Sequence, residues 1–173
     1  ENGIGKTTFL KCIIDDSFAD NGSTKWSENS AIGYFAQNHS EEFKSNITLF
    51  DWMAKWIHQE DDIETIRGTL GRLLFSQDDI NKPVSVLSGG EQRRMLFGKI
   101  ILQRANVIIL DEPTNHLDME SIESLNHALN IFDGTTIFVS HDREFISSLA
   151  TRLIELKSDK IIEHSSYENY QSS

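Results

Sequence analysis

Hydrophobic and polar positions recur along this chain with a period that changes from segment to segment, and the changes predict where helices and strands lie. Apolar residues at helical spacing predict a helix over 7–14, and a short run rich in Ile, Tyr and Phe over 31–36 is typical of a strand. Helical spacing returns from 48 to 75. The first half of the chain is therefore expected to hold a helical insertion after its first strand.

The second half alternates helices and strands more strictly. Ser88 followed by Glu91 has the spacing of a capping box, which predicts a helix from Ser88 to about Gln103. The elements expected after it are a strand over 106–110, a helix over 119–130, a strand over 135–139, a helix over 142–150 and a terminal pair near 153–156 and 160–162. This alternation indicates an α/β fold.

Composition narrows the class of protein. The 173 residues are 38% hydrophobic and 25% charged, which is ordinary for one globular domain. No apolar run approaches the roughly 18 residues of a membrane helix, so no direct membrane insertion is expected. The formal net charge of -11 opposes non-specific binding to a phosphate backbone. A single cysteine and no signal peptide after Glu1 favour a cytoplasmic location.

The chain opens on a phosphate-binding pattern. Residues 1–7 read Glu-Asn-Gly-Ile-Gly-Lys-Thr, which matches G-x-x-x-x-G-K-[ST] without its first glycine. Such a loop directs backbone N–H groups and a helix N-terminus at phosphates, with Lys6 on the β- and γ-phosphates and the Thr7 hydroxyl on Mg²⁺. A nucleotide site is therefore expected, in a fragment whose natural start lies upstream of Glu1.

Two adjacent acids follow an apolar run. Residues 107–110 are Val-Ile-Ile-Leu, which is typical of a buried strand, and Asp111 and Glu112 come next. Ligands in α/β sheets bind at the carboxyl ends of strands, so Asp111 is placed to hold Mg²⁺ through water. Glu112 is placed to orient and deprotonate an attacking water.

Residues 87–91, Leu-Ser-Gly-Gly-Glu, begin a predicted helix with a hydroxyl and free backbone donors, which suits either a plain helix cap or an anion site. With the other motifs, this segment resembles the signature of the ATP-binding cassette (ABC) family. The motifs that carry the resemblance are the P-loop, Gln37 after a strand, Leu87–Glu91, Asp111–Glu112, the turn Asn115–Asp118 and Ser140–Arg143. Their order and spacing cover nearly the whole chain.

The resemblance implies a P-loop NTPase (RecA-like) core with a helical signature subdomain, lacking its N-terminal strands. It divides a partial nucleotide-binding domain, 1–173, into a segment 1–37 from the P-loop to the Gln37 loop, a helical subdomain at about 47–100, and a segment 105–173 with the remaining motifs. It also implies a second cassette, upstream in the same chain or in a homodimer, because this family closes each ATP between two such domains.

The same resemblance assigns the site residues, with ATP and Mg²⁺ as ligands. The residues expected to bind this domain's own nucleotide are Asn2, Gly3, Ile4, Gly5, Lys6, Thr7 and Thr8. Those expected to be catalytic are Glu112, His141 and Gln37, and those expected to hold the metal are Thr7, Gln37 and Asp111. Those expected to face the partner's nucleotide are Ser88, Gly89, Gly90 and Glu91, and Asp118 is expected at the dimer seam.

Finer features separate two classes of function. Segments 111–122 and 140–145 resemble the ABC-F family of twin-cassette proteins that act on the ribosome, and the helical insertion resembles the second cassette of one bacterial type. This favours a ribosome-associated translation factor that reaches the ribosome through regions outside this chain. The alternative is the ATP-binding subunit of an ABC membrane transporter. A structural-maintenance or repair ATPase is excluded, because the stretch between Lys6 and Leu87 is too short for its coiled coil.

Other conspicuous side chains have a simpler interpretation. Trp52 and Trp56, four residues apart, are expected to pack on the domain rather than to bind a partner. Cys12 is expected to be a small core residue. The histidines without metal-ligand spacing, which are expected at the surface, are His39, His58, His127 and His164.

Overall fold

The computed structural model describes residues 4–115, 117–157 and 160–171. The chain divides into two compact units. One unit is Glu28–Leu110, and the other joins Glu1–Ser27 to Asp111–Ser173.

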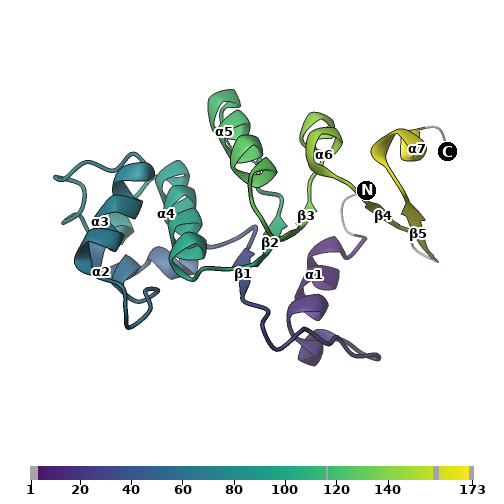
Figure 1. Ribbon diagram of the computed structural model, residues 1–173, viewed down its shortest axis with the longest axis horizontal. Helices are drawn as coiled ribbons and strands as arrows, with labels where there is room; N and C mark the ends of the chain where they lie inside the picture. The colour runs from purple at the N-terminus through teal and green to yellow at the C-terminus, as the bar shows by residue number, and fades with distance from the viewer. Residues whose placement is uncertain (1–3, 116, 158–159, 172–173) are drawn as a thin grey trace. The chain divides into compact units, whose positions relative to one another are not determined.

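The unit Glu28–Leu110 combines a pair of strands with three helices. Strand β1 (Ile32–Phe35) runs parallel to β2 (Val107–Asp111), with Ile32 opposite Val107. The helices that pack on one another in Figure 1 are α2 (Leu49–Ala54), α3 (Ile63–Arg72) and α4 (Gly89–Leu102). The short 3-10 turns of this unit are Ser40–Phe43 and Val84–Val86. The predicted α/β fold with a parallel sheet is confirmed.

The predicted helical insertion consists of two helices. Helix α2 ends at Ala54, and α3 begins at Ile63 after the N-cap Asp62. The Asp62 carboxylate accepts the Thr65 N–H at 2.9 Å. An aspartate at this position satisfies an amide that the first turn of a helix leaves without a partner, so it starts a new helix.

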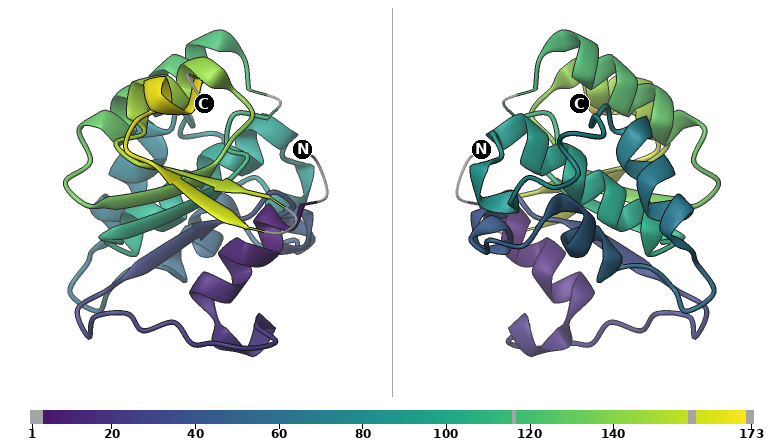
Figure 2. Two further views of the ribbon diagram at one scale, coloured as in Figure 1. Left: turned by 90° about the vertical axis from the view of Figure 1, so that its right-hand side faces the viewer. Right: turned by 90° about the vertical axis from the view of Figure 1, so that its left-hand side faces the viewer.

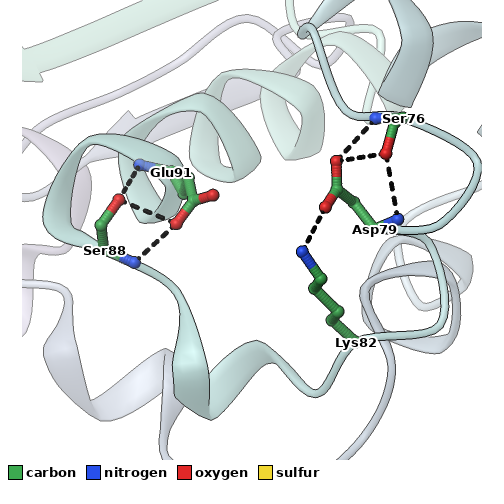
Figure 3. A network of polar contacts seen from close by, with 5 residues as sticks. All are labelled: Ser76, Asp79, Lys82, Ser88 and Glu91. Atoms are coloured by element: carbon green, nitrogen blue, oxygen red, sulfur yellow. Dashed lines mark hydrogen bonds and ion pairs between the residues drawn. The ribbon is translucent and has the colours of Figure 1, made fainter.

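Helix α4 begins where the sequence predicts. The Ser88 hydroxyl oxygen accepts the Glu91 N–H at 3.4 Å, and the Glu91 carboxylate accepts both the N–H and the hydroxyl of Ser88 at 2.8 Å. Figure 3 shows this reciprocal pair near a second network of Ser76, Asp79 and Lys82. The predicted capping box is confirmed.

Trp52 and Trp56 pack inside this unit, as predicted. Trp52 is 2% exposed, and its ring stacks on Phe43 with centroids 5.1 Å apart. The Trp56 ring lies 4.1 Å from Lys99 Nζ, and Lys99 also forms an ion pair with Glu42 at 2.8 Å. These contacts hold the α2 region against α4.

The other unit draws its elements from both ends of the chain. Its elements are α1 (Lys6–Ile14), the 3-10 turn Asp16–Phe18, α5 (Met119–Asn130), β3 (Thr135–Val139), α6 (Arg143–Leu149), β4 (Leu153–Leu156), β5 (Ile161–His164) and α7 (Tyr167–Gln171). Strands β4 and β5 pair in antiparallel fashion as a twisted ribbon, yellow in Figure 2, and α7 packs on β5. The predicted bounds of α5 and β3 are confirmed, whereas α7 was not predicted.

His164 is not the surface residue that the sequence predicts. It is 9% exposed, and its Nε2 lies 3.3 Å from Glu155 Oε2 across the β4–β5 ribbon. Its ring packs edge-on against Tyr170 of α7, with centroids 5.3 Å apart. The prediction was wrong because this five-residue helix, which carries too few residues for a periodic pattern, covers the end of β5.

The remaining predictions for isolated side chains have mixed outcomes. His58 and His127 are exposed, as predicted. His39 is half-buried, because aromatic rings of its own unit pack around it. Cys12 is also half-buried, and its Sγ donates to the Phe18 carbonyl at 3.3 Å.

Gly98→Ala is expected to destabilise the protein by about 1 to 3 kcal/mol, because overpacking a core forces neighbours to move. A Cβ at this position of α4 would lie 2.2 Å from Met53 Cε and 2.6 Å from Leu73 Cδ1. The matched control is Gly68→Ala in α3, where a Cβ meets nothing within 4 Å. This control should gain roughly 0.5 to 1 kcal/mol from helix propensity. Thermal unfolding of the full-length protein measures both, and equal midpoints would contradict the close packing at Gly98.

Candidate functional site

The N-terminus of α1 is shaped to receive an anion. Gly5 precedes the helix with a φ of +96°, a left-handed conformation that glycine adopts without steric cost. Its carbonyl accepts the Phe9 N–H at 2.8 Å, which starts the helical ladder. The earlier amides of the first turn have no intrahelical acceptor, and with the helix dipole they favour a phosphate in front of them. Lys6 and Thr7 stand at this end of the helix.

The carboxylate of Asp111 is buried at the end of β2. Asp111 is 1% exposed, and neither of its carboxylate oxygens has a hydrogen-bond partner among the described residues. Burying an ionised carboxylate without a partner costs on the order of several kcal/mol, so a cation bound at this position would stabilise it. Carboxylate oxygens are ligands that Mg²⁺ prefers, and Asp111 therefore fits the expected metal ion.

The backbone turns sharply at Glu112. Its φ of +51° is uncommon for a residue with a Cβ, and conformations of this kind concentrate at functional sites. Its N–H donates to the Val139 carbonyl at 2.9 Å, at the end of β3. In this conformation Glu112 Oε2 accepts the backbone N–H of His141 at 3.2 Å. Through these two hydrogen bonds, Glu112, the residue after β2, is tied to the end of β3 and to the segment that follows it.

Lys6, His141 and Glu112 form one polar group, here called the Lys6–His141–Glu112 cluster. His141 Nε2 lies 3.3 Å from Lys6 Nζ and 3.2 Å from Glu112 Oε1. His141 Nε2 is the atom in both contacts. When it carries no proton it accepts a hydrogen bond from Lys6, and when it carries one it donates to Glu112. The cluster brings a cation, a titratable imidazole and a carboxylate within hydrogen-bonding range.

The environment of Glu112 makes it a stronger base than an ordinary glutamate. Glu112 is 7% exposed, and burial raises the pKa of its carboxyl group. The positive charges of His141 and Lys6 and the hydrogen bond from His141 N–H oppose that rise. A carboxylate with a raised pKa in such a position suits proton transfer near neutral pH.

Two hydroxyl groups that were given no role in the sequence analysis support the cluster. Ser140 Oγ accepts the Asp142 N–H at 3.0 Å and lies 3.4 Å from Thr114 Oγ1. Asp142 in turn caps α6 by accepting the Phe145 N–H at 3.0 Å. These bonds fix the backbone on both sides of His141. Their position in the sequence could have indicated this role, because Thr114 and Ser140 come shortly after the ends of β2 and β3.

The other predicted residues are placed within their own units. Asp118 caps α5 by accepting the Ser121 N–H at 2.8 Å. Gln37 is exposed two residues after the end of β1, and Ser88 and Gly89 are exposed at the start of α4. The predicted residues that lie outside the described part of the chain are Asn2, Gly3 and His116.

A model of one protein family matches residues 1–115, and its description is "ABC transporter". The chain belongs to the ABC transporter family. The expected resemblance is thereby confirmed at family level, and the fold is that of a P-loop NTPase. None of the helices in the described part of this ABC chain combines the length and apolar character of a membrane span.

Individual relatives agree with the expected resemblance to ABC-F proteins. The "Probable ATP-binding protein YbiT" of Escherichia coli O157:H7 is 59% identical over 98% of this chain, which spans 32% of that protein. The "Uncharacterized ABC transporter ATP-binding protein YkpA" of Bacillus subtilis is 41% identical over 94% of this chain, which spans 30% of it. The human "ATP-binding cassette sub-family F member 3" is 40% identical over 88% of this chain, which spans 21% of it. The chain thus spans less than a third of each of these relatives.

Solved structures with this fold come from different systems. A chain in the "Model of ribosome-bound archaeal Pelota and ABCE1" aligns with a TM-score of 0.77 and 25% identity, over 99% of this chain and 30% of that one. A "putative metal-chelate type ABC transporter" aligns with a TM-score of 0.74 and 20% identity, over 99% of this chain and 75% of that one. The two scores are so close that the fold alone does not separate a transporter from a ribosome-bound protein.

Glu112→Gln is expected to stabilise the full-length protein at neutral pH. The folded-state pKa of Glu112 is raised above the unfolded value, so the ionised group opposes folding above that folded pKa. The opposition fades as the pH falls through the folded pKa towards the unfolded value of about 4.3, because both states then bind a proton. Thermal unfolding at several pH values should show a higher midpoint for the variant at pH 7 to 8 and a smaller gain in acid. A gain that grows in acid would contradict the raised pKa.

Proposed function

We propose that this chain binds ATP with Mg²⁺ and hydrolyses it as one cassette of an ABC-F-type protein. The observation that carries the proposal is the Lys6–His141–Glu112 cluster next to Asp111, whose buried carboxylate has no hydrogen-bond partner among the described residues. A cation at a helix N-terminus, a base with a raised pKa and a metal ligand are the parts that phosphoryl transfer to water requires.

The phosphates of ATP would be bound by the first turn of α1. The amides of that turn, together with Gly5 and the Lys6 ammonium, would supply donors to anionic oxygens, and Thr8 would extend this donor set. Asp111, Thr7 and Gln37 would hold Mg²⁺, which when bound supplies positive charge against the phosphate oxygens. The role of the chain's own residues is then to fix the γ-phosphate in front of Glu112.

Proton transfer would begin at the Glu112 carboxylate. Glu112 accepts a proton from the attacking water, and its raised pKa increases the driving force for that transfer. His141 holds Glu112 Oε2 through its backbone N–H, so the carboxylate keeps one orientation. When Lys6 moves to the phosphates, His141 Nε2 loses that neighbour and becomes available to the γ-phosphate. The contact between Lys6 and His141 would therefore be replaced by contacts of both side chains with the nucleotide.

A second cassette would complete the site. We assign Ser88, Gly89, Gly90 and Glu91 to the nucleotide of that partner, since the free amides at the start of α4 suit an anion. The Ser88 hydroxyl donates to Glu91 within the capping box and would rotate to reach a phosphate. Asp118 would lie at the seam between the cassettes. One cassette would then consist of a P-loop region, 1–37, a signature region, about 47–100, and a region with the remaining motifs, 105–173.

Action on the ribosome is the finer part of the proposal. Its support is the 59% identity to YbiT over 98% of this chain and the similarity to proteins named as sub-family F members. A cytoplasmic translation factor with two cassettes would bind the ribosome through regions outside this chain. The alternative, a subunit that powers a membrane transporter, is supported by the family description and by the transporter structure of similar fold.

In the full-length protein, Glu112→Gln should retain ATP binding and lower kcat about 10²- to 10⁴-fold, the range for loss of a general base. ATP hydrolysis and equilibrium binding of ATP measure the two effects separately. Glu123→Gln, at an exposed position of α5, is the matched control and should keep wild-type kcat. Unchanged turnover in Glu112→Gln would remove Glu112 from the reaction.

Trapping the closed state should distinguish the two partners. Full-length Glu112→Gln with ATP is expected to sediment with ribosomes from the same cell extract, and to do so less with ADP, because the unhydrolysed nucleotide holds two cassettes together. Sucrose-gradient fractions and solubilised membranes are probed for the same tagged protein. Recovery with an integral membrane complex, and none with ribosomes, would favour the transporter alternative.

A further inference from the structure

Thr114 follows Glu112 in a tight turn. The Asn115 N–H donates to the Glu112 carbonyl at 3.3 Å, which closes a β-turn with Pro113 in its second position. Proline suits that position because its ring holds φ at about -65°. The turn therefore sets the position of the Thr114 side chain relative to Glu112.

The Thr114 side chain is buried, and its hydroxyl lies against Ser140. Thr114 is 8% exposed, and its Oγ1 lies 3.4 Å from Ser140 Oγ. Among the described residues, this hydroxyl has no other hydrogen-bond partner. Ser140 Oγ accepts the Asp142 N–H at 3.0 Å and still keeps its own proton and a lone pair for Thr114. Because a buried hydroxyl is costly to leave without a partner, the two side chains are held together.

This contact is one of three that join the segment after β2 to the segment after β3. The Glu112 N–H donates to the Val139 carbonyl at 2.9 Å, a backbone bond that side-chain substitutions leave in place. The His141 N–H donates to Glu112 Oε2 at 3.2 Å and so orients the carboxylate. Since His141 directly follows Ser140, the contact between Thr114 and Ser140 holds the backbone that carries this donor.

We propose that Thr114 is a positioning residue for ATP hydrolysis, which acts through Ser140 on the His141 N–H. The inference rests on the proposed function, because the group that Thr114 keeps in place is the Glu112 carboxylate, directed at the attacking water. Small errors in the orientation of a reacting group lower the rate of the chemical step. ATP binding should not depend on this hydroxyl, since the donors proposed for the phosphates belong to the first turn of α1.

Two substitutions in the full-length protein separate the hydroxyl of Thr114 from its methyl group. Thr114→Val keeps the branched shape without the hydroxyl, so kcat should fall about 5- to 30-fold, the factor that one hydrogen bond contributes, with an unchanged Kd for ATP. Thr114→Ser keeps the hydroxyl and should retain most of kcat, although the lost buried methyl group lowers its thermal midpoint. Purely structural packing predicts the reverse order of kcat.

The matched control is Ser147→Ala in α6. It removes an exposed hydroxyl that donates to the Glu144 carbonyl at 3.0 Å, so it should keep wild-type kcat. Hydrolysis at saturating ATP gives kcat, and equilibrium binding of ATP gives Kd. Should Thr114→Val fail to fold, Ser140→Ala removes the same contact from the other side.

Combining Thr114→Val with Glu112→Gln tests whether the hydroxyl acts through the carboxylate. The double variant should turn over no more slowly than Glu112→Gln alone, because the base that Thr114 positions is already lost. Wild-type kcat in Thr114→Val, a loss that Thr114→Ser fails to restore, or a further loss in the double variant would overturn the inference. In those cases a low kcat in Glu112→Gln leaves the proposed function standing, whereas unchanged turnover in Glu112→Gln would overturn both.

Discussion

The site depends on burying two adjacent carboxylates at the end of one strand. Asp111 and Glu112 are both less than a tenth exposed, and their ionised forms cannot share one apolar environment without compensation. The left-handed φ of Glu112 separates them, because it turns the second carboxylate towards His141 while the first remains in line with β2. That turn is fixed by the bond from Glu112 N–H to the Val139 carbonyl, so the end of β3 determines where the Glu112 carboxylate lies.

Helix starts were predictable because caps are local. Ser88, Asp118 and Asp142 each cap a helix by accepting an amide three residues on, and the cap at Ser88 was predicted from the sequence. The sequence predicted a helical insertion without its division into α2 and α3, since apolar residues at helical spacing continue on both sides of the Asp62 cap. Burial of His164 was missed because α7, which covers it, is too short for a periodic signal.

The sequence motifs singled out candidate site residues, whose roles stay predictions, but gave no information on their mutual geometry. Motif order pointed to Lys6, Glu112 and His141, yet no sequence rule predicts that one imidazole nitrogen lies between a lysine and a glutamate. The pKa of Glu112 follows from burial, which depends on segments distant in sequence. Strain at Glu112 was likewise invisible, because glutamate rarely adopts a positive φ and nothing in the local sequence signals it.

Buried charge, rather than the number of ion pairs, separates functional from structural electrostatics here. Exposed pairs such as Arg152 with Glu163 contribute at most about 1 kcal/mol each, because water screens both partners. Asp111 and Arg93 are each less than a tenth exposed, and neither has a hydrogen-bond partner among the residues that the structure describes. With a net charge of -11, the chain has more acidic than basic side chains. The carboxylate near His39, that of Glu42, is nevertheless paired with Lys99 and not with Arg93. Among the residues that the structure describes, the buried carboxylate of Asp111 is left without a partner, so a cation bound there would stabilise it more than any exposed pair could.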